Sequence, residues 1–191
     1  MKKMKLTKFL PYLIIILYSF YILYPIFISP GVLHGNDWGL PLTDDQIKNF
    51  DNEYKYSWVY SNPFGERNFL YHTKIFSFPL YVVNTFGVSG ELFSKLFLLG
   101  TFIFSGIGLF FLLNYFKINR IISTLASLIY ISTPIFFNYS IMGWTFVLLN
   151  FGILPITVLF FVKGNKEKKL RYIIMTSLLY SIAILQSQAI I

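Results

Sequence analysis

The chain has 191 residues, of which 55% are apolar and only 13% are charged, and its formal net charge is +8. A soluble domain carries about 25% charged residues, so the composition indicates a membrane-spanning protein. The sequence has no cysteine and only two histidines, which excludes disulfides and thiolate metal sites and argues against a histidine-rich metal site.

Five apolar stretches are predicted to be transmembrane helices, because each approaches the roughly 20 residues needed to cross the hydrocarbon core. They cover residues 10–28, 96–116, 121–137, 145–162 and 172–191. Pro25, Pro134 and Pro155 lie inside or near the ends of these stretches, where neighbouring helices or Ser/Thr side chains can satisfy the freed carbonyls. The expected fold is an all-α, multispanning membrane helix bundle in a single membrane domain.

Basic residues cluster at connections that fall on the same side if all five stretches cross. These clusters are Lys2, Lys3, Lys5 and Lys8; Lys117 and Arg120; and Lys163, Lys166, Lys168, Lys169 and Arg171. The positive-inside rule makes that side the cytoplasm. We therefore expect a multi-pass protein of the cell membrane, with residues 1–9 cytoplasmic and residues 29–95 external.

Two other interpretations of these features are less favoured. Nucleic-acid binding would need a basic face on a soluble element, whereas the charges here are divided among short connections, so no nucleic-acid partner is expected. A cleaved signal peptide would have a shorter apolar core and a small-residue cleavage site, which "FISPGVLHG" does not offer.

The external loop is predicted to contain two helices that lie along the membrane surface. Thr43 and Gln46 match a capping box, and an aromatic-rich stripe follows at helical spacing, formed by Ile47, Phe50, Tyr54 and Trp58. An ordinary amphipathic helix of a small outer domain is an alternative to a surface-lying one. A second apolar segment, Ile75 to Val88, is too short for a span and reads as interfacial or re-entrant. Lys95 is expected to snorkel to the lipid head groups.

Several short segments of the sequence resemble a known protein family. They are "HGNDWGLPL" after the first span, "YSWVYSNPFGERN" further along the loop, and "ASLIYISTPIFFNY" followed by "FGILPITVLFF" in the later spans. With this layout, the chain resembles the N-terminal part of the GT-C class of membrane glycosyltransferases, including archaeal relatives and YfhO-like proteins. That class transfers sugars from polyprenyl-phosphate donors, and members carry a functional acidic residue in the first outer loop.

The resemblance implies an inverting sugar transfer on the external face, with Asp37 as the base that takes the acceptor's proton. Trp38 would stack on a sugar or sit at the interface. Arg67, His72 and Lys74 would meet the lipid phosphate, or simply contact head groups. Asp37 could equally close an Asx-type turn. A divalent ion such as Mg²⁺ or Mn²⁺ would help the phosphate to leave, although the sequence itself assigns no metal site.

The chain also departs from that class. GT-C modules generally have seven or more spans, whereas "AILQSQAII" ends inside the fifth predicted helix, as expected of a truncated or front part of a larger protein. The alternative is a non-enzymatic membrane remnant, or a helper subunit that packs against other transmembrane helices. Within the spans, four amide side chains are expected to face protein and four small residues to allow close helix approach. The former are Asn114, Asn150, Gln186 and Gln188, and the latter are Gly100, Ser105, Gly106 and Gly108.

Overall fold

A computed structural model describes residues 3–31, 58–59, 66–67, 82 and 85–187. Its helices are α1 (Lys3–Ile28), α4 (Gly90–Tyr115), α5 (Arg120–Ile131), α6 (Pro134–Ile141), α7 (Thr145–Glu167) and α8 (Leu170–Ser187). A two-residue antiparallel pair joins β1 (Trp58–Val59) to β2 (Glu66–Arg67). The described chain is otherwise helical, which confirms the predicted all-α class.

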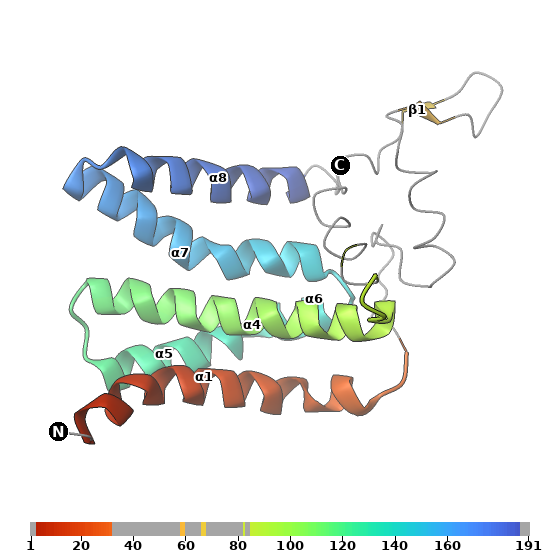
Figure 1. The fold of residues 1–191 in the computed structure, drawn as a ribbon, viewed down its shortest axis with the longest axis horizontal. Helices are drawn as coiled ribbons and strands as arrows, with labels where there is room; N and C mark the ends of the chain where they lie inside the picture. Colours follow the sequence, from red (N-terminus) through yellow and green to blue (C-terminus); the bar gives the residue numbers. More distant parts are fainter. Residues whose placement is uncertain (1–2, 32–57, 60–65, 68–81, 83–84, 188–191) are drawn as a thin grey trace.

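The long helices form a flat bundle. In Figure 1, α1, α4, α7 and α8 lie side by side in that order, and α4 packs on both α1 and α7. The shorter α5 packs against α1 and α4, and α6 packs against α7. Successive spans, with α5 and α6 together forming one of them, run in alternating directions, so the connections between spans gather at the two ends of the bundle.

Within the described residues, four helical segments are long and apolar enough to cross a membrane. They are Phe9–Ile28, Gly90–Tyr115, Arg120–Ile141 and Val147–Glu167. The apolar helix α8 has 18 residues, which corresponds to about 27 Å at 1.5 Å per residue. The chain is therefore an integral, multi-pass membrane protein, as its composition indicates.

Two of the described helices begin at residues whose side chains satisfy a free backbone N–H. The Ser89 hydroxyl accepts the N–H of Leu92 at the start of α4, and the Asn119 side chain accepts the N–H of Ile121 at the start of α5. Left-handed backbone at Lys117 (φ 62°) and Lys168 (φ 50°) ends the helices before the two tight connections. Because Ser89 caps it, α4 begins six residues before the predicted span at 96.

The third predicted span is broken into two helices. Residue 133, which precedes Pro134, is disfavoured in helical backbone, and α5 ends at Ile131 while Pro134 occupies the first turn of α6. The hydroxyls of Ser132 and Thr133 bond back to the carbonyls of Leu128 and Tyr130. The backbone N–H groups of Ser132 and Thr133 donate to the same two carbonyls, so at the break each carbonyl accepts both a backbone N–H and a hydroxyl.

Pro155 interrupts α7 without ending it. A proline inside a helix has no N–H for the carbonyl four residues earlier, which here is that of Phe151. The hydroxyl of Tyr130 donates to that carbonyl across the helix interface, with an oxygen–oxygen distance of 2.7 Å. A neighbouring helix therefore supplies the missing donor.

Small residues bring α4 close to its neighbours. A Cβ added at Gly106 would lie 2.7 Å from a methyl of Ile15, and one added at Gly108 would lie 3.6 Å from Ile156. Ser105 is fully buried. These three positions match the predicted close approach, but Gly100 does not, because it is exposed and a Cβ there would meet nothing within 4 Å.

The structure describes the side chains of two of the four amide residues predicted to face protein. Asn114 is half-buried and donates to the carbonyl of Phe110 on its own helix. Asn150 is also half-buried, and its side-chain oxygen has no hydrogen-bond partner within the described chain. The side chain of Gln186, and Gln188 altogether, lie outside the described residues.

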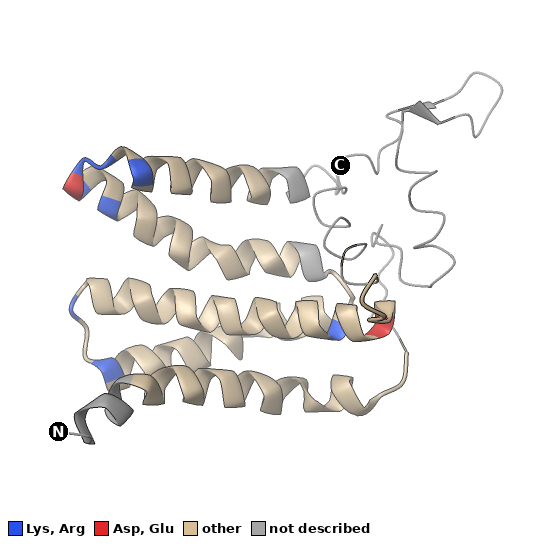
Figure 2. Cartoon of the chain, viewed as in Figure 1, with Lys and Arg blue, Asp and Glu red and all other residues tan. Residues whose placement is uncertain are grey.

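Charged connections gather at one end of the bundle. Figure 2 shows the lysines and arginines of the α4–α5 and α7–α8 connections at the same end as the N-terminus. Glu167 and Lys169 form an ion pair of 2.8 Å there. The loop between α1 and α4 leaves and re-enters at the opposite end.

Most of the predicted structure of that loop lies outside the described residues. Trp58, the last member of the predicted aromatic stripe, is in strand β1, so the predicted helix does not extend to it. Trp58 instead pairs with Arg67 in the short antiparallel pairing of β1 with β2. Thr85 to Gly87, near the end of the second predicted surface helix, form a turn.

Candidate functional site

A buried lysine lies at the loop end of the bundle. Lys95 stands on α4 and is only 6% exposed. Its ammonium donates to the carbonyl of Ser29 at 2.6 Å and to a carboxylate oxygen of Glu91 at 2.6 Å, and it lies 3.5 Å from the carbonyl of Phe27. The side chain thus joins the start of α4 to the last turn of α1.

The partly exposed carboxylate of Glu91 takes part in the same junction. Its side chain is 42% exposed, and the oxygen that accepts from Lys95 also accepts the N–H of Gly31 at 3.2 Å. Glu91 lies in the first turn of α4, where a negative charge is favoured by the helix dipole. Both side chains therefore fix the point at which the loop between α1 and α4 leaves α1.

The prediction that Lys95 snorkels to the head groups is wrong. The ammonium is held within the junction instead, because the carbonyls of Phe27 and Ser29 and the carboxylate of Glu91 give it hydrogen-bond acceptors there. A buried ammonium is tolerated where such acceptors replace water. The spacing of Glu91 and Lys95 along one helix face is the sequence signal for this pair.

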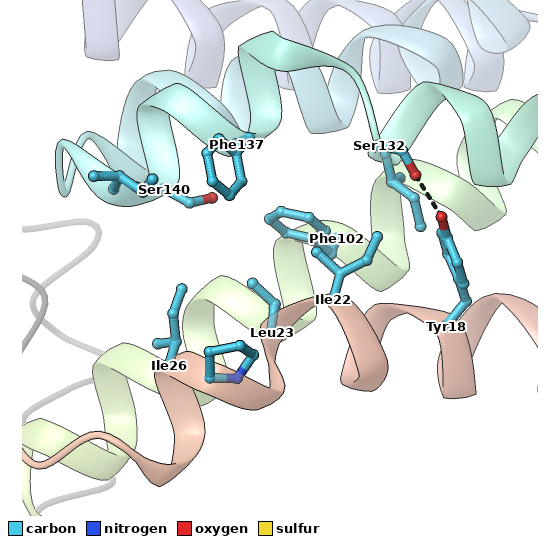
Figure 3. A pocket seen from close by; sticks show the side chains of 11 residues that line it. Tyr18, Ile22, Leu23, Ile26, Phe102, Ser132, Phe137 and Ser140 are labelled. Atoms are coloured by element: carbon cyan, nitrogen blue, oxygen red, sulfur yellow. Dashed lines mark hydrogen bonds between the residues drawn. The ribbon is translucent and has the colours of Figure 1, made fainter.

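An apolar cavity of about 510 Å³ lies beside this junction. Figure 3 shows Phe137 and Ser140 of α6 across the cavity from Ile22 and Ile26 of α1, with Phe102 of α4 nearby. The other residues that line it are Tyr18, Leu23, Pro25, Ile131, Ser132 and Ile141.

A second cavity of about 310 Å³ adjoins the first. Both are lined by Pro25, Ile26 and Ile141, and the second is also lined by Ser29, Pro30, Gly31 and Lys95. We call the two together the α1–α6 groove. It runs from an apolar interior to a mouth at the loop end, where Lys95 is the charged residue of its described wall.

Most residues singled out from the sequence cannot be placed in this site. Asp37, Trp38, His72 and Lys74 lie outside the described residues, as does His34. Arg67 is described only through the backbone of β2, where it pairs with Trp58.

The described residues do not assemble a metal site. Within them, no group of three or more histidine or acidic side chains comes together. The carboxylate nearest the groove, Glu91, is engaged by Lys95 and Gly31. The described part of the chain therefore gives no donor set for a divalent ion.

Comparison with known proteins identifies no relative. No protein-family model matches the chain, and no curated protein or solved structure is significantly similar to it.

Proposed function

We propose that this chain is part of a membrane sugar transferase that uses a polyprenyl-phosphate-linked sugar on the external face of the membrane, as in the GT-C class. The observation that carries the proposal is the position of the loop that contains Asp37 and Trp38. This loop joins α1 to α4 at the end of the bundle opposite the basic connections. By the positive-inside rule, basic connections are cytoplasmic, and the loop is then external.

Asp37 is the proposed base. The acceptor hydroxyl oxygen attacks the anomeric carbon while the carboxylate takes its proton, and the bond from that carbon to the lipid phosphate breaks. The configuration at the anomeric carbon is inverted in this single displacement. Arg67, His72 and Lys74 are proposed to stabilise the charge on the departing phosphate, and Trp38 to stack on the sugar.

The test is glycolipid analysis of cells from which the gene is deleted. Deletion should remove one class of glycolipid, and the wild-type gene should restore it. Asp37→Asn should fail to restore it although the protein accumulates normally in the membrane. Asp45→Asn is the matched control. Asp45 lies between the capping-box residues Thr43 and Gln46, where a carboxylate favours the start of the predicted helix, and this variant should restore the glycolipid fully.

Restoration by Asp37→Asn would remove the assignment of the base. An unchanged glycolipid profile after deletion, together with loss of another membrane protein from the cells, would instead support the helper-subunit alternative. In that case the chain acts by packing against the spans of its partner.

A further inference from the structure

We propose that the α1–α6 groove binds a bilayer phospholipid with an anionic headgroup. One acyl chain would fill the apolar cavity, and the phosphate would lie at the mouth against Lys95. This inference does not rest on the sugar-transfer proposal.

The groove interior suits a hydrocarbon chain. Its wall is mostly aliphatic and aromatic, and its hydroxyls are already engaged within the protein. The hydroxyls of Tyr18 and Ser132 share a hydrogen bond of 2.9 Å (Figure 3), and Ser140 donates to the carbonyl of Phe136. A polar ligand would lose its hydration there without gaining new partners.

The groove opens where lipid chains are at hand. Two of the residues that line it, Phe137 and Ile141, have 60% and 64% of their surface exposed. Both stand on α6, which belongs to a membrane-spanning segment. The occupant can therefore enter sideways from the bilayer.

The size of the cavity favours a chain over a helix. A helix with side chains is at least 10 Å wide and rises 5.4 Å per turn, so a single turn occupies about 420 Å³ as a cylinder. The apolar cavity of about 510 Å³ would hold little more than one turn. A lipid chain, by contrast, is narrow and flexible enough to follow the groove.

The mouth selects the charge of the headgroup. Lys95 lines the second cavity and Glu91 does not. The ammonium is buried and bonded to Glu91, Ser29 and Phe27, whereas the carboxylate is 42% exposed. A phosphate at the mouth would bind the ammonium by displacing Glu91, which competes with it for the same N–H donors. Removing the competitor should strengthen binding, and removing the ammonium should weaken it.

The test uses the full chain, purified and equilibrated with equal amounts of phosphatidylglycerol and phosphatidylcholine. Native mass spectrometry counts the lipids that remain bound. We expect one phosphatidylglycerol per chain, in preference to phosphatidylcholine. Lys95→Met should lower that preference about tenfold, and Glu91→Gln should raise it. These opposite effects cannot both arise from a general loss of folding.

A second pair of variants tests the chain-binding part of the groove. Ile141→Trp should fill the space shared by the two cavities and abolish retention. Ile129→Trp is the matched control, because Ile129 is similarly exposed (69%) on the same broken span but lines neither cavity. It should leave retention unchanged.

Three results would overturn the proposal. Equal retention of the two lipids would exclude recognition of the headgroup, and full retention by Ile141→Trp would place the lipid elsewhere. Disulfide cross-linking of an Ile141→Cys variant to a second copy would show that a protein covers the groove. Displacement of phosphatidylglycerol by a polyprenyl phosphate would also reject this occupant, while supporting the sugar-transfer proposal.

Discussion

Tyr130 on α5 donates a hydrogen bond to the carbonyl of Phe151 on α7, the carbonyl that Pro155 leaves without its helical partner. The last turn of α5, where its span is broken, thus supplies the hydrogen-bond donor that Pro155 removes from α7. Tyr130 also packs edge-on against Phe136, with ring centroids 5.3 Å apart. The pairing ties the position of α5 to the bend of α7.

Tyr130→Phe should destabilise the protein by about 1 kcal/mol, because the carbonyl of Phe151 loses its donor. In a Pro155→Ala background the backbone N–H at position 155 supplies a donor, and the same substitution should cost measurably less. Reversible unfolding in SDS across the four-variant cycle measures this coupling. Equal destabilisation by Tyr130→Phe in both backgrounds would show that the Tyr130 hydroxyl does not compensate for Pro155.

Two glycines of α4 should respond oppositely to alanine. Gly106→Ala should destabilise by roughly 1–3 kcal/mol because the new methyl meets Ile15. Gly100→Ala should stabilise by up to about 1 kcal/mol, since it adds helix propensity in open space. The same unfolding assay compares them, and a loss at Gly100 as large as that at Gly106 would argue against the α1–α4 packing.

The connection between α4 and α5 should be stabilised by glycine. Lys117 has φ 62°, a left-handed conformation that costs a residue with a side chain about 1 kcal/mol. Lys117→Gly should therefore be more stable than Lys117→Ala by about that amount. Both variants lose the same charge, so the comparison isolates the backbone; equal unfolding free energies would show that Lys117 is unstrained.

The proposed orientation can be tested by single cysteines, since the native sequence has none. Met142 is exposed between α6 and α7, at the loop end of the bundle, and Lys166 lies near the opposite end of α7. A maleimide that cannot cross membranes should label Met142→Cys in intact cells and Lys166→Cys only after lysis. The reverse pattern would place the Asp37 loop in the cytoplasm.

The spans were largely predictable from the sequence because hydropathy over 20 residues depends little on the neighbours of any one residue. Their ends were less so. The prediction began the second span at 96, after the charges of Glu91 and Lys95, whereas α4 begins at Gly90. The spacing of Glu91 and Lys95 could have indicated their ion pair, but only the three-dimensional structure shows that carbonyls at the end of α1 also accept from the Lys95 ammonium.

The α1–α6 groove could not have been found from the sequence. It is lined by residues from α1, α4, α5 and α6, and such a hollow depends on how helices distant in sequence pack. Tyr18 and Ser132, which meet in its wall, are 114 residues apart. The loop residues proposed for sugar transfer, by contrast, stand on sequence reasoning alone.

The contact between Tyr130 and Phe151 also places two discontinuities at one depth of the membrane. The helix break before Pro134 and the absent backbone hydrogen bond at Pro155 belong to neighbouring spans. Neither span has a continuous series of helical hydrogen bonds at that depth. At that depth the two spans are held to each other by the hydrogen bond from Tyr130 to Phe151, which stands in place of a hydrogen bond within α7.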